Sequence, residues 1–130
     1  MSSSITNEVV DFILGRPYAP KEVKAKAVEH IVDGLAVMLA GSRTDCSKML
    51  VDFLGECRSD SSCTLVGFET KSSPPDSALV NGTSGHADDY DDTQLSTSPD
   101  RTYGLLTHPT VPALAASLAV GERLGCSGGE

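Results

Sequence analysis

Apolar side chains recur at helical spacing in five parts of this chain of 130 residues. In the first part they share one face from Ile5 to Ile13, with Ser4 just before them and Gly15 just after. A serine hydroxyl can accept a free backbone N–H at a helix start, and glycine commonly ends a helix. The pattern predicts a short first helix between Ser4 and Gly15.

A longer apolar stripe follows Pro20, a residue favoured at helix starts, and continues to Gly41. Its apolar residues recur every four positions, at Val23, Ala27, Ile31, Leu35 and Leu39. The stripe widens until residues 34–41 are apolar nearly all round, so we expect the second half of this helix to be deeply buried.

The following residues predict a third helix and then a change of period. Asp45 can cap this helix, and its apolar face runs from Leu50 to Cys57. Residues 63–69 are rich in apolar and β-branched side chains between polar turns, which predicts one short strand or hairpin there. A single strand is not stable without a partner.

A fourth helix is expected to open at Pro74 and Pro75. Along it, Ala78, Gly82 and Gly85 form a row of small side chains at i, i+4 and i+7. Glycine inside a helix costs about 1 kcal/mol relative to alanine, so this row indicates close packing against another helix.

Residues 94–107 are expected to form a polar loop, and Pro109 opens a fifth helix that ends at Gly125. The predicted fold class is mainly α, a portion of a helical bundle with one short strand or hairpin near 63–69. Residues 125–130 are typical of a connection between helices, so we expect residues 1–130 to be an incomplete piece of a larger domain.

The composition indicates a soluble protein and excludes several function classes. The net charge is -8, no basic patch is present, and there are six aromatic residues, so nucleic acid and anionic membrane surfaces are not expected partners. The N-terminus lacks the charged and apolar regions of a secretory signal. The longest apolar run is too short to span a bilayer. We expect a cytoplasmic protein.

Four cysteines are present, Cys46, Cys57, Cys63 and Cys126. They have neither CxxC spacing nor a histidine at zinc-ligand spacing. Cys57 and Cys63 flank a polar loop and could approach each other, but a stable bridge is not expected in a reducing compartment. We therefore expect reduced thiols.

The densest chemistry lies at residues 88–92, where four aspartates follow His86 and precede His108. If the fourth helix continued through them, Asp89 and Thr93 would share one face with His86. Such a cluster suits acid/base or metal chemistry. The alternative is a solvated acidic loop that only ends the helix.

Two metal interpretations compete with acid/base chemistry. Residues 88–92 fit the DDxxD pattern of enzymes that hold magnesium and a diphosphate, but a second aspartate-rich motif and basic residues are missing. A metal site on His86 is weaker, because no further histidine lies at ligand spacing. We expect no metal and no cofactor.

His108 precedes Pro109, at the expected start of the fifth helix. Free backbone N–H groups of Thr110 and Val111 would favour an anion there, and a histidine beside them can add a proton or hydrogen bond. A substrate carboxylate would suit this place. The alternative is that His108 is an ordinary polar residue at a helix start.

These motifs together resemble the MmgE/PrpD family, which includes 2-methylcitrate dehydratase, cis-aconitate decarboxylase and iminodisuccinate epimerase. The resemblance is carried by Ala78-Leu79-Val80-Asn81-Gly82-Thr83 through His86, by Asp89-Tyr90-Asp91-Asp92-Thr93, and by His108-Pro109. It extends to residues 33–41 and 121–125, so it spans most of the chain.

The resemblance implies a cofactor-independent enzyme for small di- or tricarboxylates, with a large all-helical domain, a smaller α+β domain and a homodimeric assembly. Residues 1–130 would be the N-terminal part of the helical domain. It also implies site positions at Asp89 and His108 as catalytic residues and Thr93 as a substrate-binding residue, with His86 and Asp92 supporting them.

The expected function is a lyase of the 2-methylcitrate dehydratase kind, in which Asp89 or His108 moves a proton next to a substrate carboxylate. The length of residues 94–107 leaves an isomerase, epimerase or decarboxylase of the same family open. A small non-catalytic helical interaction domain is the alternative from another class.

Overall fold

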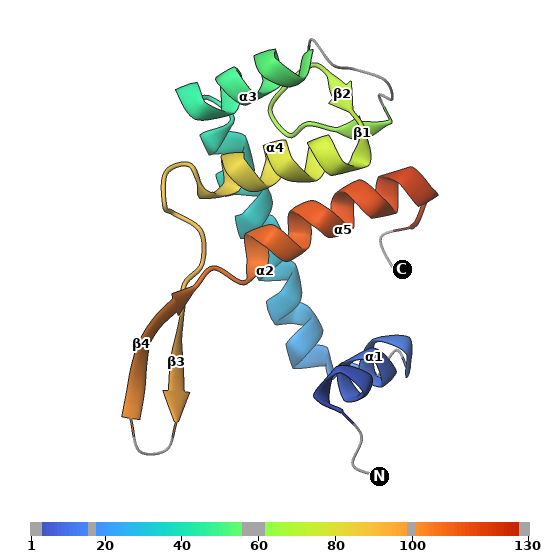
Figure 1. The fold of residues 1–130 in the computed structure, drawn as a ribbon. Coiled ribbons are helices and arrows are strands. Elements are labelled where there is room, and N and C mark those ends of the chain that lie inside the picture. The colour runs from blue at the N-terminus through green and yellow to red at the C-terminus, as the bar shows by residue number, and fades with distance from the viewer. Residues whose placement is uncertain (1–3, 16–17, 56–61, 99–100, 128–130) are drawn as a thin grey trace.

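The computed structural model describes residues 4–15, 18–55, 62–98 and 101–127. For residues 96–98 and 101–106 it describes the backbone only. These residues form five helices and two antiparallel hairpins (Figure 1). The elements are α1 (Ile5–Gly15), α2 (Lys21–Gly41), α3 (Asp45–Gly55), β1 (Cys63–Thr64), β2 (Lys71–Ser72), α4 (Pro74–His86), β3 (Gln94–Ser98), β4 (Arg101–Thr107) and α5 (Thr110–Leu124). The mainly α expectation is confirmed.

The helix ends follow local sequence signals. The Asn7 N–H donates to Ser4 Oγ at 3.3 Å before α1, and the Asp76 N–H donates to Ser73 Oγ at 3.4 Å at the start of α4. Both serines satisfy N–H groups that have no partner inside the helix. At the end of α5, Gly125 has φ 67°, the left-handed conformation that glycine adopts without steric cost.

The third helix differs in one detail from the expectation. Asp45 is the first residue of α3 and does not precede it. Thr44 stands before the helix, where its carbonyl oxygen accepts the Lys48 N–H at 3.2 Å and its hydroxyl contacts Ser47 Oγ at 3.1 Å. Thr44, and not Asp45, therefore occupies the N-cap position of α3.

The strand or hairpin expected near 63–69 is the first strand and the turn of a small hairpin, in which Cys63 pairs with Ser72 and Thr64 with Lys71. The expected polar loop at 94–107 is wrong, since β3 and β4 pair antiparallel over this segment. Threonine and tyrosine favour extended backbone, and Pro99-Asp100 separates the two runs in the sequence, a turn signal that the loop interpretation missed.

The core lies where the C-terminal half of α2 meets α4 and α5, around Met38, Val111 and Ala115. The small-residue row of α4 allows this contact: a Cβ on Gly85 would lie 2.5 Å from Val111 Cγ1, and one on Gly82 would lie 3.9 Å from Ala115 Cβ. The expectation that the row meets a neighbouring helix closely is confirmed.

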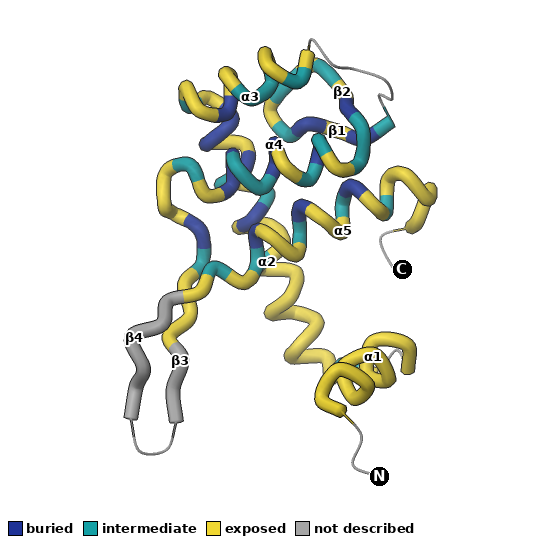
Figure 2. Tube along the Cα trace, viewed as in Figure 1, coloured by how far each residue is buried: buried dark blue, intermediate teal, exposed yellow. Residues whose placement is uncertain are grey.

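The expectation of deep burial around the whole end of α2 is wrong. Its buried residues are Gly34, Met38 and Gly41, whereas Leu39 on another face is 54% exposed. The reason is that α4 and α5 cover one side of α2 only. Helix α1 contains no buried residue (Figure 2). Phe12 and other apolar side chains of this helix are exposed. The described part of the chain thus presents wide apolar surfaces.

Cys46 and Cys126 are exposed free thiols, and Cys63 is a buried one whose Sγ lies 3.2 Å from the Ala119 carbonyl oxygen. Cys57 lies outside the described residues.

None of the described helices combines the length and apolar character that a membrane-spanning helix needs.

Candidate functional site

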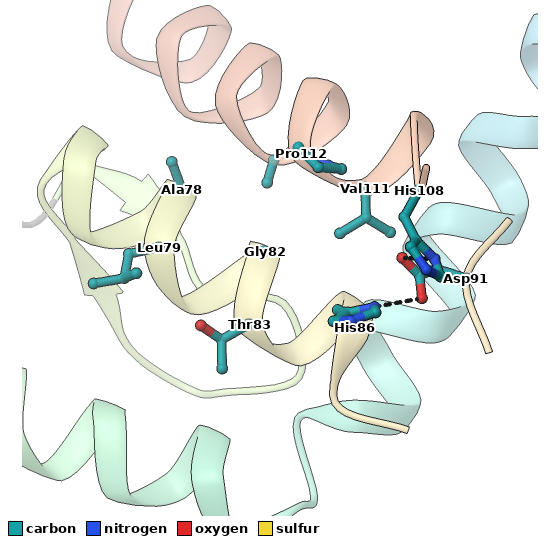
Figure 3. A pocket seen from close by; sticks show the side chains of 10 residues that line it. Ala78, Leu79, Gly82, Thr83, His86, Asp91, His108, Val111 and Pro112 are labelled. Atoms are coloured by element: carbon teal, nitrogen blue, oxygen red, sulfur yellow. Dashed lines mark hydrogen bonds and ion pairs between the residues drawn. The ribbon is translucent and has the colours of Figure 1, made fainter. Parts of the chain in front are cut away.

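A cleft with a volume of about 410 Å³ runs between α4 and α5 (Figure 3). One end carries His86, Asp91 and His108, and the rest of its lining is nearly all apolar or small. The other lining residues are Ala78, Leu79, Gly82, Thr83, Val111, Pro112 and Ala115. Polar chemistry is therefore concentrated at one end of the cleft.

Helix α4 ends at His86 because the chain turns sharply after it. The Ala87 N–H donates to the Ser84 carbonyl at 3.3 Å, and the Asp89 N–H donates to the His86 carbonyl at 3.1 Å. Asp89 has φ 56°, a left-handed conformation that aspartate tolerates better than most residues. The helix does not continue through the aspartates, so the expected alignment of Asp89 and Thr93 on one helical face is wrong.

The β3–β4 hairpin brings the two halves of the site together. Gln94 pairs with Thr107, so the residues before β3 and after β4 become neighbours. Asp92 then meets the start of α5: its Oδ1 accepts the Thr110 N–H at 3.2 Å and its Oδ2 accepts the Thr110 hydroxyl at 2.8 Å. Asp92 therefore binds the Thr110 N–H, one of the two backbone groups that were expected to be free for an anion.

Asp91 is the centre of the cluster. Its side chain is 1% exposed, with Oδ1 at 2.9 Å from His86 Nδ1 and Oδ2 at 3.2 Å from His108 Nδ1. The two imidazole rings meet edge to face with centroids 4.6 Å apart. Asp89 Oδ1 lies farther off, at 3.9 Å from His86 Nδ1 and 3.8 Å from His108 Nε2.

Electrostatics favour the protonated form of His86. Its hydrogen bond to Asp91, and then the negative charge of that carboxylate, raise the pKa of His86 above its ordinary value of 6.5. Burial opposes this shift, and the charge of Asp89 adds to it. A protonated His86 is able to donate a proton toward the cleft.

The raised pKa of His86 predicts a pH-dependent stability. A group whose pKa is raised by folding stabilises the protein below its unfolded pKa, and the contribution is lost as pH rises through the folded pKa. His86→Asn should therefore lower the melting temperature more at pH 5.5 than at pH 9. Because the His86 side chain is 55% exposed, the loss should be a few degrees at most.

Thermal unfolding of wild type and variant at both pH values measures this difference. His30→Asn is the matched control, because His30 lies on α2 and its Nδ1 is 3.8 Å from Asp92 Oδ2, away from Asp91. An equal loss of melting temperature at both pH values would contradict the explanation that the contact with Asp91 raises the pKa of His86.

Four side chains in the cluster carry atoms that can bind a metal: His86, Asp89, Asp91 and His108 offer ligand atoms within 4.8 Å of one another. Imidazole and carboxylate donors suit zinc, manganese and iron. No further histidine lies at ligand spacing from His86 in the sequence, but the fold brings His108 beside it. However, Asp91 already faces both imidazoles directly, so an ion would have to separate these contacts.

The structure brings together some of the residues singled out in the sequence. Asp89, His86 and His108 lie in one cluster, while Asp92 is used at the start of α5. Thr93 is exposed and does not line the cleft, so its role in substrate binding remains a prediction. Sequence reasoning missed the central position of Asp91, because nothing in a run of four aspartates marks which one is buried.

A protein-family model described as the MmgE/PrpD N-terminal domain matches residues 8–130. No curated protein and no solved structure gives a significant match. The family match covers the cleft, the cluster around Asp91 and both of the helices that frame them.

Proposed function

The chain belongs to the MmgE/PrpD family, and from that premise we propose that it is part of a lyase acting on a small di- or tricarboxylate. The proposed reaction is a dehydration of the 2-methylcitrate dehydratase kind, without a cofactor. The observation that carries the proposal is the grouping of two imidazoles and the buried Asp91 at the end of an apolar cleft.

The geometry supports division of the proton transfers between the two histidines. His108 Nε2 takes the proton from the carbon beside a substrate carboxylate, and Asp89, at 3.8 Å from that nitrogen, stabilises the imidazolium that forms. Protonated His86 gives its proton to the departing hydroxyl oxygen. One C–H and one C–O bond break, a double bond forms, and water leaves.

Substrate binding needs cationic groups that the described residues do not place in the cleft. The cleft lining contains no lysine or arginine among the described residues, and the chain has a net charge of -8. We propose that residues 1–130 are the N-terminal part of the helical domain and that cationic side chains from outside this segment, with Thr93, bind the substrate carboxylates. We further propose a homodimeric, cytoplasmic enzyme with a second, α+β domain.

An isomerase, epimerase or decarboxylase of the same family would use the same cluster. A dehydratase or an epimerase moves a proton at carbon, whereas a decarboxylase replaces CO₂ by a proton. The products therefore separate these reactions. The proposal of another class, a non-catalytic helical interaction domain, gains some support from the exposed apolar residues of α1, including Ile5 and Phe12.

Incubation of the intact protein with small hydroxy di- and tricarboxylates in D₂O tests the function. We expect loss of water to give an unsaturated product, with deuterium entering the carbon beside the carboxylate in the reverse reaction. Proton NMR measures both. A product that keeps the hydroxyl but changes configuration would indicate an epimerase, and release of CO₂ a decarboxylase. Absence of any turnover over the whole substrate panel would favour the interaction domain.

The same assay in excess chelator tests the metal interpretations. We expect unchanged turnover, because the proposed proton transfers use side chains alone. Loss of activity in EDTA with rescue by magnesium would favour the diphosphate interpretation, and rescue by zinc or manganese would assign a metal to the histidine–aspartate cluster. Rescue by magnesium is disfavoured because Asp92 already binds Thr110 and Asp91 is buried.

A further inference from the structure

The two oxygens of Asp91 face two different histidines. Oδ1 lies 2.9 Å from His86 Nδ1, and Oδ2 lies 3.2 Å from His108 Nδ1. We propose that Asp91 is a positioning residue shared by both histidines: it holds the proton of each ring on Nδ1 and leaves each Nε2 to exchange a proton with the substrate. The part that concerns the substrate rests on the proposed function above.

The chemistry of the groups supports this assignment. An ionised carboxylate only accepts hydrogen bonds, and a neutral imidazole carries its single proton on one of its two nitrogens. Asp91 is 5% exposed overall, and its Oδ2 and His108 Nδ1 are both buried; they lie 3.2 Å apart and have no hydrogen-bond partner among the described residues. His86 Nδ1 is already hydrogen-bonded to Oδ1. Leaving Oδ2 and His108 Nδ1 unpaired in a buried place would be costly, so we infer that Nδ1–H of His108 turns toward Oδ2.

The consequence for catalysis is a fixed direction of proton transfer. With Nδ1–H turned to Asp91, the lone pair of His108 Nε2 is free to accept a proton, and Nε2–H of protonated His86 is free to donate one. The transfer makes His108 cationic and His86 neutral, so the total charge of the three residues does not change. Asp91 keeps its negative charge throughout and stabilises whichever imidazole is protonated.

The neighbouring aspartates are less suited to this role. Asp89 is more distant from both rings and its side chain is 78% exposed. Asp92 accepts hydrogen bonds from Thr110, and the histidine near it is His30 of α2. Asp88 is exposed and has no hydrogen bond or ion pair among the described residues.

The substitution D91N tests the inference in the intact protein. Asparagine offers one accepting oxygen and one donating amide, so one of the two histidines loses its acceptor and must carry its proton on Nε2. We expect ¹⁵N NMR of the imidazoles to show Nδ1–H in both neutral rings of the wild type and Nε2–H in one ring of D91N. We expect kcat to fall roughly a hundredfold, with a smaller change in KM.

Asp88→Asn is the matched control, since it removes the same charge from an exposed neighbour and should change neither the tautomers nor kcat. Asp91→Glu keeps the carboxylate and should retain the Nδ1–H tautomer more fully than D91N. Finding Nε2–H in either neutral ring of the wild type would overturn the inference, even if D91N does not fold. Unchanged tautomers in folded D91N would also overturn it.

Failure of the inference can be distinguished from failure of the proposed function. If the wild type turns over no carboxylate, the function is wrong, while the NMR spectra still decide the role of Asp91. If turnover is present but D91N keeps wild-type kcat, the function stands and Asp91 is not a positioning residue.

Discussion

His108→Asn is expected to lower the turnover of the intact protein by roughly a hundredfold or more, the usual scale for a lost acid/base group. In asparagine the side-chain amide nitrogen takes the place of Nδ1, so the donor toward Asp91 is kept. The nitrogen equivalent to Nε2 is missing, and with it the atom that takes the proton. The loss should therefore appear in kcat with little change in melting temperature.

The control for this variant is His30→Asn, which changes the histidine on α2 and should leave turnover unchanged. His108→Ala is expected to behave differently, because it removes the imidazole that lies 3.2 Å from the buried Asp91 Oδ2 and leaves no group there that could pair with the carboxylate. That should add a loss of stability of about 1–3 kcal/mol. Full activity of His108→Asn would remove His108 from the proposed mechanism.

Gly41→Ala is expected to destabilise the protein by at least about 2 kcal/mol. A Cβ at this position would overlap the Ser84 carbonyl oxygen and lie 3.2 Å from Ala87 Cβ. The Ser84 carbonyl is part of the α4 backbone, which cannot rotate away as a flexible side chain could. Helices α2 and α4 would have to move apart, and His86, two residues after Ser84, would move with α4.

Chemical denaturation of Gly41→Ala measures the loss, with Gly55→Ala as the matched control. A Cβ on Gly55 would meet nothing within 4 Å, so this second variant should cost no stability. Stability of Gly41→Ala equal to that of the wild type would mean that α2 and α4 do not pack as closely as described.

Local signals in the sequence were sufficient to predict the helices. The ends of α1, α4 and α5 depend on Ser4, the Pro74-Pro75 pair and Gly125, which act through their nearest backbone neighbours. The small residues Gly82 and Gly85 likewise indicated close helix packing. These features can be predicted because each depends on residues a few positions apart.

The β3–β4 hairpin was missed for a different reason. Leu95 and Leu106 are register partners only because antiparallel pairing brings the two strands together. Serine and threonine in the two strands were interpreted as loop composition, although threonine is also favoured in strands. The pairing places His108 beside the aspartates. Neither the length nor the polarity of residues 94–107 indicates how close His108 comes to them.

The sequence by itself determined the family, the helices and the set of titratable residues at 86–92 and 108, because these depend on residue types and on short spacings. Only the tertiary structure decided their roles. It bound Asp92 to Thr110 and buried Asp91 between two histidines. The physical reason is that burial and pairing depend on atoms from separate segments, so four similar aspartates acquire different environments only when the chain has folded.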